Sequence, residues 1–151
     1  EEGGLKLVET PSIRDYTQPA RFLSGGSGLV SNTEDYLRFC QMLLNKGRMG
    51  SARILGRKSV ELMFMNHLAP DVPFVDPGYG FGLGGRVLVD PARANTLGTA
   101  GSWGWGGAAN TKFWIDPRED LIAILMTQFM PNELHPLHTD FVNLVYQSLV
   151  D

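Results

Sequence analysis

Alternation of apolar and polar side chains is clearest near the C-terminal end of the chain. Residues 111–116 (TKFWID) repeat with the period of two that predicts a β-strand. Residues 116–120 (DPRED) carry the proline and acidic side chains of a turn. Residues 121–126 (LIAILM) form a continuous apolar run, which is typical of a strand buried on both faces. The pattern therefore predicts a hairpin, whose first strand begins in a glycine-rich edge, residues 101–107 (GSWGWGG).

Apolar side chains at helical spacing predict three helices around this hairpin. The first follows an N-cap at Ser31 or Asn32 and ends at Gly47, a residue type that suits the position after a helix. The second covers about residues 57–66, and the third covers about residues 137–150 with an apolar stripe that should pack on the sheet. With the hairpin, these segments predict an α+β fold in which flanking helices cover an antiparallel sheet.

A second glycine-rich stretch contains the motif G-x-G-x-x-G at Gly80, Gly82 and Gly85. In a dinucleotide-binding site this motif follows a strand and opens a helix. Here the strand-like sequence RVLVD follows it, so we discard a nucleotide site. We predict instead a glycine-rich strand that pairs antiparallel with the central hairpin, followed by a loop over residues 91–100.

Composition narrows the class of protein. The chain has 151 residues, 43% of them hydrophobic and 19% charged, which suits a single domain over residues 1–151. A net charge of −3 gives no reason to expect nucleic acid or an anionic membrane as a partner. Cys40 is the single cysteine, so we expect a small buried side chain and no internal disulfide. No apolar run is long enough for a membrane span.

The start of the sequence bears on localisation. The chain begins at Glu1 without a methionine or a signal-like segment, which suggests the inside of a longer protein. Any targeting signal would lie upstream of Glu1, so the compartment is unknown.

The glycine- and tryptophan-rich stretch has two interpretations. Glycine allows a ligand or another backbone to approach closely, and Trp103 and Trp105 place large flat surfaces beside it. Alternatively, the glycines mark a tight bend and the tryptophans belong to the core. The residues alone leave both interpretations open.

Two weaker patterns suggest other chemistry. Ser102 lies one residue short of a G-x-S-x-G nucleophile elbow, and acidic and histidine residues follow it in the order of α/β-hydrolases. That elbow requires a helix directly after the serine, whereas glycines and a strand follow here. His135 and His138 resemble a metal pair, but no third ligand stands at a recognised spacing. We therefore expect neither a metal nor another cofactor.

Residues 101–128 (GSWGWGGAANTKFWIDPREDLIAILMTQ) resemble the third active-site segment of the serine β-lactamase and penicillin-binding-protein superfamily. The closer resemblance is to the β-lactamase-like (family VIII) carboxylesterases, which have Trp-Gly-Gly where many β-lactamases have Lys-Thr-Gly. That triplet is Trp105, Gly106 and Gly107 here. The resemblance extends to residues 22–31 and the helix after them, and it implies the C-terminal portion of such an enzyme.

The resemblance implies acyl transfer through a serine nucleophile, for which these enzymes need three parts. Two parts are the motifs Ser-x-x-Lys and Tyr-x-Asn or Ser-x-Asn, which lie upstream in family members. Here no serine has a lysine three residues later, and no tyrosine has an asparagine two residues later. The third part is a main-chain N–H that binds the oxyanion, which the resemblance assigns to Ala108.

The resemblance also assigns substrate contacts to the residues around the triplet, which are Trp103, Trp105, Gly106 and Gly107. Because Trp105 replaces a lysine that could bind a carboxylate, it favours neutral esters over carboxylated β-lactams. The expected partners are a small ester or amide substrate and the missing N-terminal half of the same enzyme, and this chain alone should be inactive. The competing hypothesis is a non-catalytic module that pairs exposed strand edges with that half or with itself.

Overall fold

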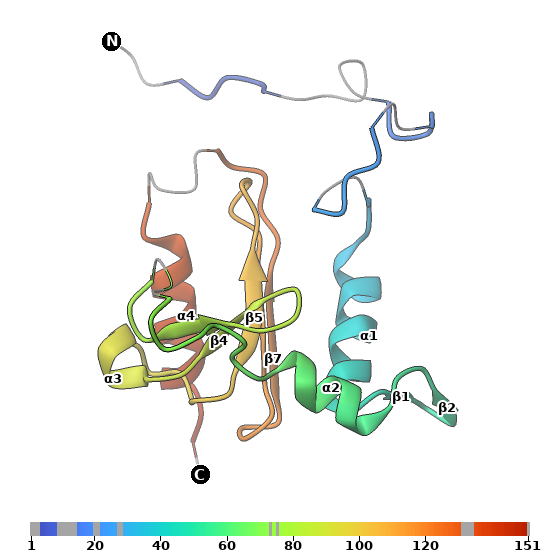
Figure 1. Cartoon of the computed structure of the whole chain (residues 1–151). Helices are drawn as coiled ribbons and strands as arrows, with labels where there is room; N and C mark the ends of the chain where they lie inside the picture. Colours follow the sequence, from blue (N-terminus) through green and yellow to red (C-terminus); the bar gives the residue numbers. More distant parts are fainter. Residues whose placement is uncertain are drawn as a thin grey trace. The chain divides into compact units, whose positions relative to one another are not determined.

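The computed structural model describes residues 4–8, 15–19, 22–26, 29–72, 74, 76–130 and 135–150. The chain divides into two compact units, residues 1–32 and residues 33–151. The described parts of the first unit consist of turns and irregular backbone without a helix or strand. The helices and strands given below all lie in the second unit (Figure 1).

Within the described residues, five strands form one antiparallel sheet in the order β3-β4-β5-β6-β7. They are β3 (Tyr79–Phe81), β4 (Arg86–Leu88), β5 (Trp103–Gly106), β6 (Lys112–Asp116) and β7 (Leu121–Leu125). The predicted hairpin is the pair β6 and β7, and the predicted glycine-rich pairing is that of β4 with β5. One boundary differs from the prediction, because β5 is a separate strand antiparallel to β6 rather than the beginning of it.

Helices cover this sheet. The remaining elements are α1 (Thr33–Leu44), α2 (Arg57–Met63), α3 (Pro91–Ala94), α4 (Leu137–Gln147) and a ribbon of β1 (Arg48–Met49) and β2 (Ala52–Arg53). In Figure 1, α1 and α4 lie on opposite sides of the sheet. This arrangement confirms the predicted α+β fold. None of the helices in the described ranges is long and apolar enough to cross a membrane.

The main core lies between the sheet and α1, on a surface that we call the α1 face. Trp103, Phe113 and Ile115 point to this face because alternate residues of a strand share a side. They form one buried cluster with Cys40 and Leu43 of α1. Cys40 is 0% exposed, as predicted, and burial raises the pKa of its thiol to about 12. Each large apolar side chain buried here contributes about 1.5–3 kcal/mol to folding.

The opposite surface, which we call the α4 face, is fastened by a polar chain. Asp116 is 0% exposed, and its Oδ2 accepts a hydrogen bond from the Tyr146 hydroxyl at 2.7 Å. Trp114 Nε1 donates to the same hydroxyl oxygen at 3.0 Å. Burial raises the pKa of Tyr146, and the Asp116 carboxylate adds to the effect. The Trp114 ring also contacts Phe141, so α4 packs on the sheet as predicted.

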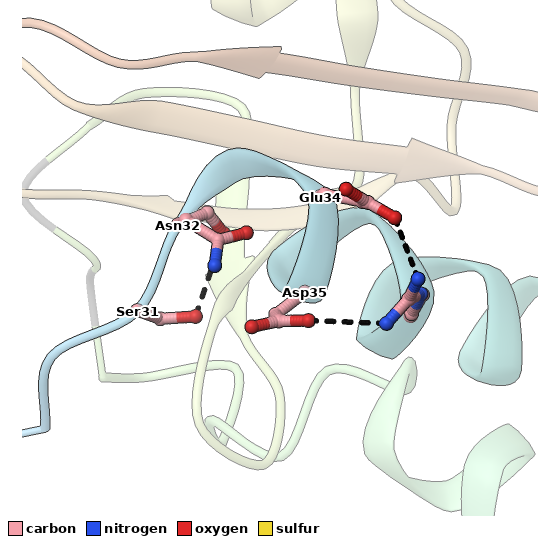
Figure 2. A network of polar contacts seen from close by, with 5 residues as sticks. Ser31, Asn32, Glu34 and Asp35 are labelled. Atoms are coloured by element: carbon pink, nitrogen blue, oxygen red, sulfur yellow. Dashed lines mark hydrogen bonds and ion pairs between the residues drawn. The ribbon is translucent and has the colours of Figure 1, made fainter.

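The first turn of α1 agrees with the sequence, since the helix begins at Thr33, directly after the predicted cap position. Glu34 and Asp35 lie in the first turn, near the positive end of the helix dipole. Arg38 pairs with Glu34 at 2.5 Å and with Asp35 at 3.3 Å, contacts that Figure 2 draws. These pairs are exposed and add little stability. The helix ends at Leu44, three residues before the predicted Gly47, whose φ is +90° and whose N–H donates to the Met42 carbonyl at 2.8 Å.

The strand β7 differs from its prediction. It pairs with β6 on one side, and no described strand lies on its other side. Ala123 is buried, whereas the other four residues of β7 are half-buried. The predicted burial on both faces is therefore only partial, since Ala123 is buried and Ile122 and Ile124 of the other face are packed against the core but remain partly exposed.

Helix boundaries also differ from their predictions. The second helix ends at Met63 rather than near residue 66. The short helix α3 replaces part of the predicted loop, since the Asp90 side chain accepts the Arg93 N–H at 3.0 Å and Pro91 starts the helix. In α4, Leu144 belongs to the predicted apolar stripe but is 65% exposed, so it does not pack on the sheet as the stripe predicted.

Candidate functional site

The Trp105-Gly106-Gly107 triplet lies where β5 extends past its neighbour β4. The register between β4 and β5 ends at Gly104, whereas β6 continues to pair with Trp105 and Gly106. Among the described residues, no strand therefore pairs with this end of β5 on the β4 side. The predicted glycine-rich edge exists only at this end, since β5 as a whole lies inside the sheet.

Ala108 lies in the tight turn that joins β5 to β6. The Asn110 N–H donates to the Gly107 carbonyl at 3.1 Å, and the Gly107 N–H donates to the Thr111 carbonyl at 2.8 Å. Ala108 therefore occupies the second position of a β-turn. It is exposed, and none of the described residues accepts a hydrogen bond from its N–H. A free donor at the end of an open strand edge can bind a developing oxyanion.

Asn110 anchors this turn and was not singled out from the sequence. It is 1% exposed with a φ of +62°, a left-handed conformation that asparagine tolerates better than most residues. Its Nδ2 donates to the Phe129 carbonyl at 3.1 Å. The neighbouring Ala109 carbonyl accepts the Thr127 hydroxyl at 2.7 Å. The segment after β7 therefore fixes the backbone that carries Ala108.

The two tryptophans of β5 have different environments. Trp103 is 3% exposed, stacks on Phe64 at 5.2 Å between ring centres, and meets Phe113 edge-on at 5.5 Å. Trp105 is 44% exposed and meets Phe81 edge-on at 5.2 Å. Trp103 thus belongs to the core, while Trp105 presents aromatic surface beside the open edge. Whether either side chain contacts a substrate stays a prediction.

Two hollows on the α4 face have volumes of about 30 Å³ and about 330 Å³. Neither is lined by the triplet or by Ala108. The nearest side chain to Gly106 on this face is His138, whose Cε1 would lie 3.6 Å from a β-carbon at Gly106. The triplet therefore lies at the surface of this chain rather than within one of these hollows.

The other sequence candidates do not assemble into a site. Ser102 is buried and is followed directly by β5 rather than by a helix. The Asp116 carboxylate is bonded to Tyr146, and the His135 ring packs against Phe129. These placements give no support to a nucleophile elbow at Ser102. In the part of the chain that the structure covers, no three His, Cys, Asp or Glu side chains gather as a metal site.

Comparison with known proteins gives consistent matches. The Beta-lactamase family matches residues 3–147. Protein Rv1367c of Mycobacterium tuberculosis (strain ATCC 25618 / H37Rv) is 37% identical over 128 residues, which are 78% of this chain and 32% of that protein. Esterase EstB of Burkholderia gladioli is 29% identical over 111 residues, covering 73% of this chain and 27% of EstB.

A solved structure extends the match to the fold. EstCE1, a hydrolase with promiscuous acyltransferase activity, superposes with a TM-score of 0.75 and 28% sequence identity. The match covers 97% of this chain and 37% of EstCE1. The chain thus spans about a third of the length of these relatives or less. The family match over almost the whole sequence confirms the predicted superfamily, and the chain belongs to the Beta-lactamase family.

Proposed function

We propose that this chain is part of an esterase that hydrolyses acyl esters through an acyl-serine intermediate. The observation that carries the proposal is the exposed Ala108 N–H at the open end of β5. The name of EstB and the description of EstCE1 as a hydrolase support this class of reaction. In this proposal the chain supplies the Trp-Gly-Gly strand and one oxyanion donor.

The chemistry follows from where charge develops. When a nucleophile attacks an ester carbonyl, the carbonyl oxygen gains negative charge, and a prepositioned N–H stabilises that charge. Two hydrogen bonds fix the turn that carries the Ala108 N–H. The Asn110 side chain donates to the Phe129 carbonyl, and the Thr127 hydroxyl donates to the Ala109 carbonyl. The Ala108 N–H therefore needs little rearrangement during the reaction. Loss of one such donor typically costs about 10²–10³ in rate.

Trp105 suggests the substrate class. Its ring is 44% exposed at the open edge and is oriented by Phe81. An aromatic surface without a charge suits an apolar acyl or alcohol group and offers no cation to a carboxylate. We therefore expect neutral esters as substrates in preference to carboxylated β-lactams.

The nucleophile and its base must come from another segment, since the chain has no Ser-x-x-Lys sequence. In the sheet of the described residues β7 has an unpaired edge, which offers a place for such a segment to add a strand. In this proposal the remaining part of the same enzyme is the partner of this chain, and the two together complete the active site.

Replacing Ala108 with proline tests the oxyanion role in the enzyme that retains all its segments. Proline lacks the N–H and is favoured at the second position of a β-turn, so the fold should survive. We expect kcat/KM for a neutral p-nitrophenyl ester to fall about 10²–10³-fold. Ala108→Gly keeps the N–H and should retain most of the activity. Wild-type activity in a folded Ala108→Pro variant would contradict the assignment.

A second hypothesis is a non-catalytic module that pairs through its strand edges. The unpaired edge of β7 in the described sheet favours it. This hypothesis predicts dimers or capture of the remaining segment without ester turnover by the assembled pair. Turnover that requires Ala108 in the assembled pair would exclude it.

A further inference from the structure

The larger hollow on the α4 face gathers basic and hydrogen-bonding side chains from three elements. Lys112 of β6, Arg86 of β4 and His138 of α4 line this space of about 330 Å³. Thr139 and Asn143 of α4 add polar groups to its wall. Lys112 is directly opposite Gly106 in the register, so the missing side chain at Gly106 leaves room beside it.

The charges around the hollow do not balance. Arg86 Nη1 lies 2.8 Å from Asp76 Oδ2, and its guanidinium carbon lies 4.4 Å above the Tyr79 ring centre. No carboxylate of the described residues forms an ion pair with Lys112. The two cations, Lys112 and Arg86, thus face the single carboxylate of Asp76, although the formal net charge of the chain is −3. The excess of positive charge is a local property of this hollow.

The basic side chains that line the hollow are half-buried. Burial, together with the charge of Arg86, lowers the pKa of Lys112 to about 8, and Asp76 opposes this shift. His138 Nε2 is buried, and none of the described groups bonds to it. Burial lowers the pKa of His138, the Asn110 backbone opposes this shift, and the charges of Lys112 and Arg86 add to the lowering. The Lys112 side chain is half-buried, and a partly desolvated ammonium and a buried ring nitrogen both gain from a polar partner.

We propose that this hollow binds a small oxyanion, either a carboxylate or a phosphate group, between Lys112, Arg86 and the first turn of α4. The Lys112 ammonium would supply charge, and the planar guanidinium of Arg86 would donate to a second oxygen. His138 and Thr139 lie in the first turn of α4, where the free N–H groups also favour an anion. The site does not depend on ester hydrolysis, because the triplet and Ala108 do not line it.

Isothermal titration of the protein with inorganic phosphate, and separately with acetate, tests the proposal at pH 7 and constant ionic strength. We expect saturable binding of at least one anion with one site per chain. Lys112→Gln should weaken it about tenfold or more, as expected for the loss of a charge-assisted hydrogen bond. Lys112→Arg should bind within a few-fold of the wild type. Preference for phosphate or for acetate distinguishes the two sources of the oxyanion.

The matched control is Lys58→Gln, which removes the same charge from a side chain that is 80% exposed and pairs with Glu61. It should leave anion binding unchanged. A ¹³C NMR titration of the Lys112 side chain in the wild type gives a second readout, since a bound anion must raise its pKa. The absence of saturable binding, equal binding by Lys112→Gln, or an unchanged Lys112 pKa in saturating anion would each overturn the proposal.

Discussion

At the scale of single residues, the glycines near the triplet serve two different purposes. A β-carbon at Gly104 would lie 2.2 Å from the Phe113 carbonyl oxygen, and one at Gly107 would lie 2.3 Å from Thr111 Oγ1. A β-carbon at Gly106 would meet its nearest atoms at 3.4 Å and 3.6 Å, which is ordinary contact. Close packing against backbone thus requires glycine at Gly104, the Thr111 hydroxyl would have to move for a side chain at Gly107, and Gly106 leaves space. The two interpretations of this stretch apply to different residues, which the sequence alone could not distinguish.

This difference predicts unequal effects of adding one methyl group. Gly104→Ala forces a β-carbon against backbone and should lower the free energy of unfolding by about 1–3 kcal/mol. Gly106→Ala is the matched control and should change it by less than about 1 kcal/mol. Urea unfolding monitored by tryptophan fluorescence measures both values. Equal destabilisation by the two variants would show that the packing at Gly104 is not as described.

At the scale of elements, the spacing of apolar residues along the sequence predicted the strand β6 and the helix α1, which pack against other elements of this chain. The strand predicted from the period of two and the helix predicted from the apolar spacing after Asn32 are both present, as β6 and α1. Which side chains are buried depends on contacts between distant segments, and a local sequence pattern does not predict these contacts. Trp103 and Trp105 share one side of β5, and contact with Phe64 decides which of them is buried. For β7, the apolar run could not reveal its place at the edge of the sheet.

The hydrogen bonds between α4 and the sheet should contribute measurably to stability. Tyr146→Phe removes the hydroxyl that donates to Asp116 and accepts from Trp114, leaving a carboxylate oxygen buried without that partner. We expect the free energy of unfolding to fall by about 1–3 kcal/mol. Tyr36→Phe is a control for loss of a hydroxyl from a ring packed on Phe113, and should cost about 0.5 kcal/mol or less. Thermal unfolding of both variants compares them, and an unaffected Tyr146→Phe would contradict the role of this polar chain.

At the scale of the whole molecule, the structure holds one side of the proposed active site. The turn at Ala108 and the open end of β5 come from this chain, while no Ser-x-x-Lys sequence does. The triplet could be found from the sequence because glycine and tryptophan carry a recognisable signal before a strand. Asn110 and the basic hollow on the α4 face could not, since their residues converge only in the folded chain. The family match is consistent with an active site shared between this chain and another segment, because the chain spans 32% of the length of Protein Rv1367c.

Labelling with a fluorophosphonate probe, followed by denaturing mass spectrometry, tests whether this chain supplies the oxyanion donor while another segment supplies the nucleophile. The probe reacts with activated serines, and mapping the adduct shows which segment carries the nucleophile. We expect no adduct on these 151 residues and one adduct on a serine of the remaining segment of the assembled enzyme. An adduct on Ser102, or the absence of any adduct on the assembled enzyme, would contradict this expectation.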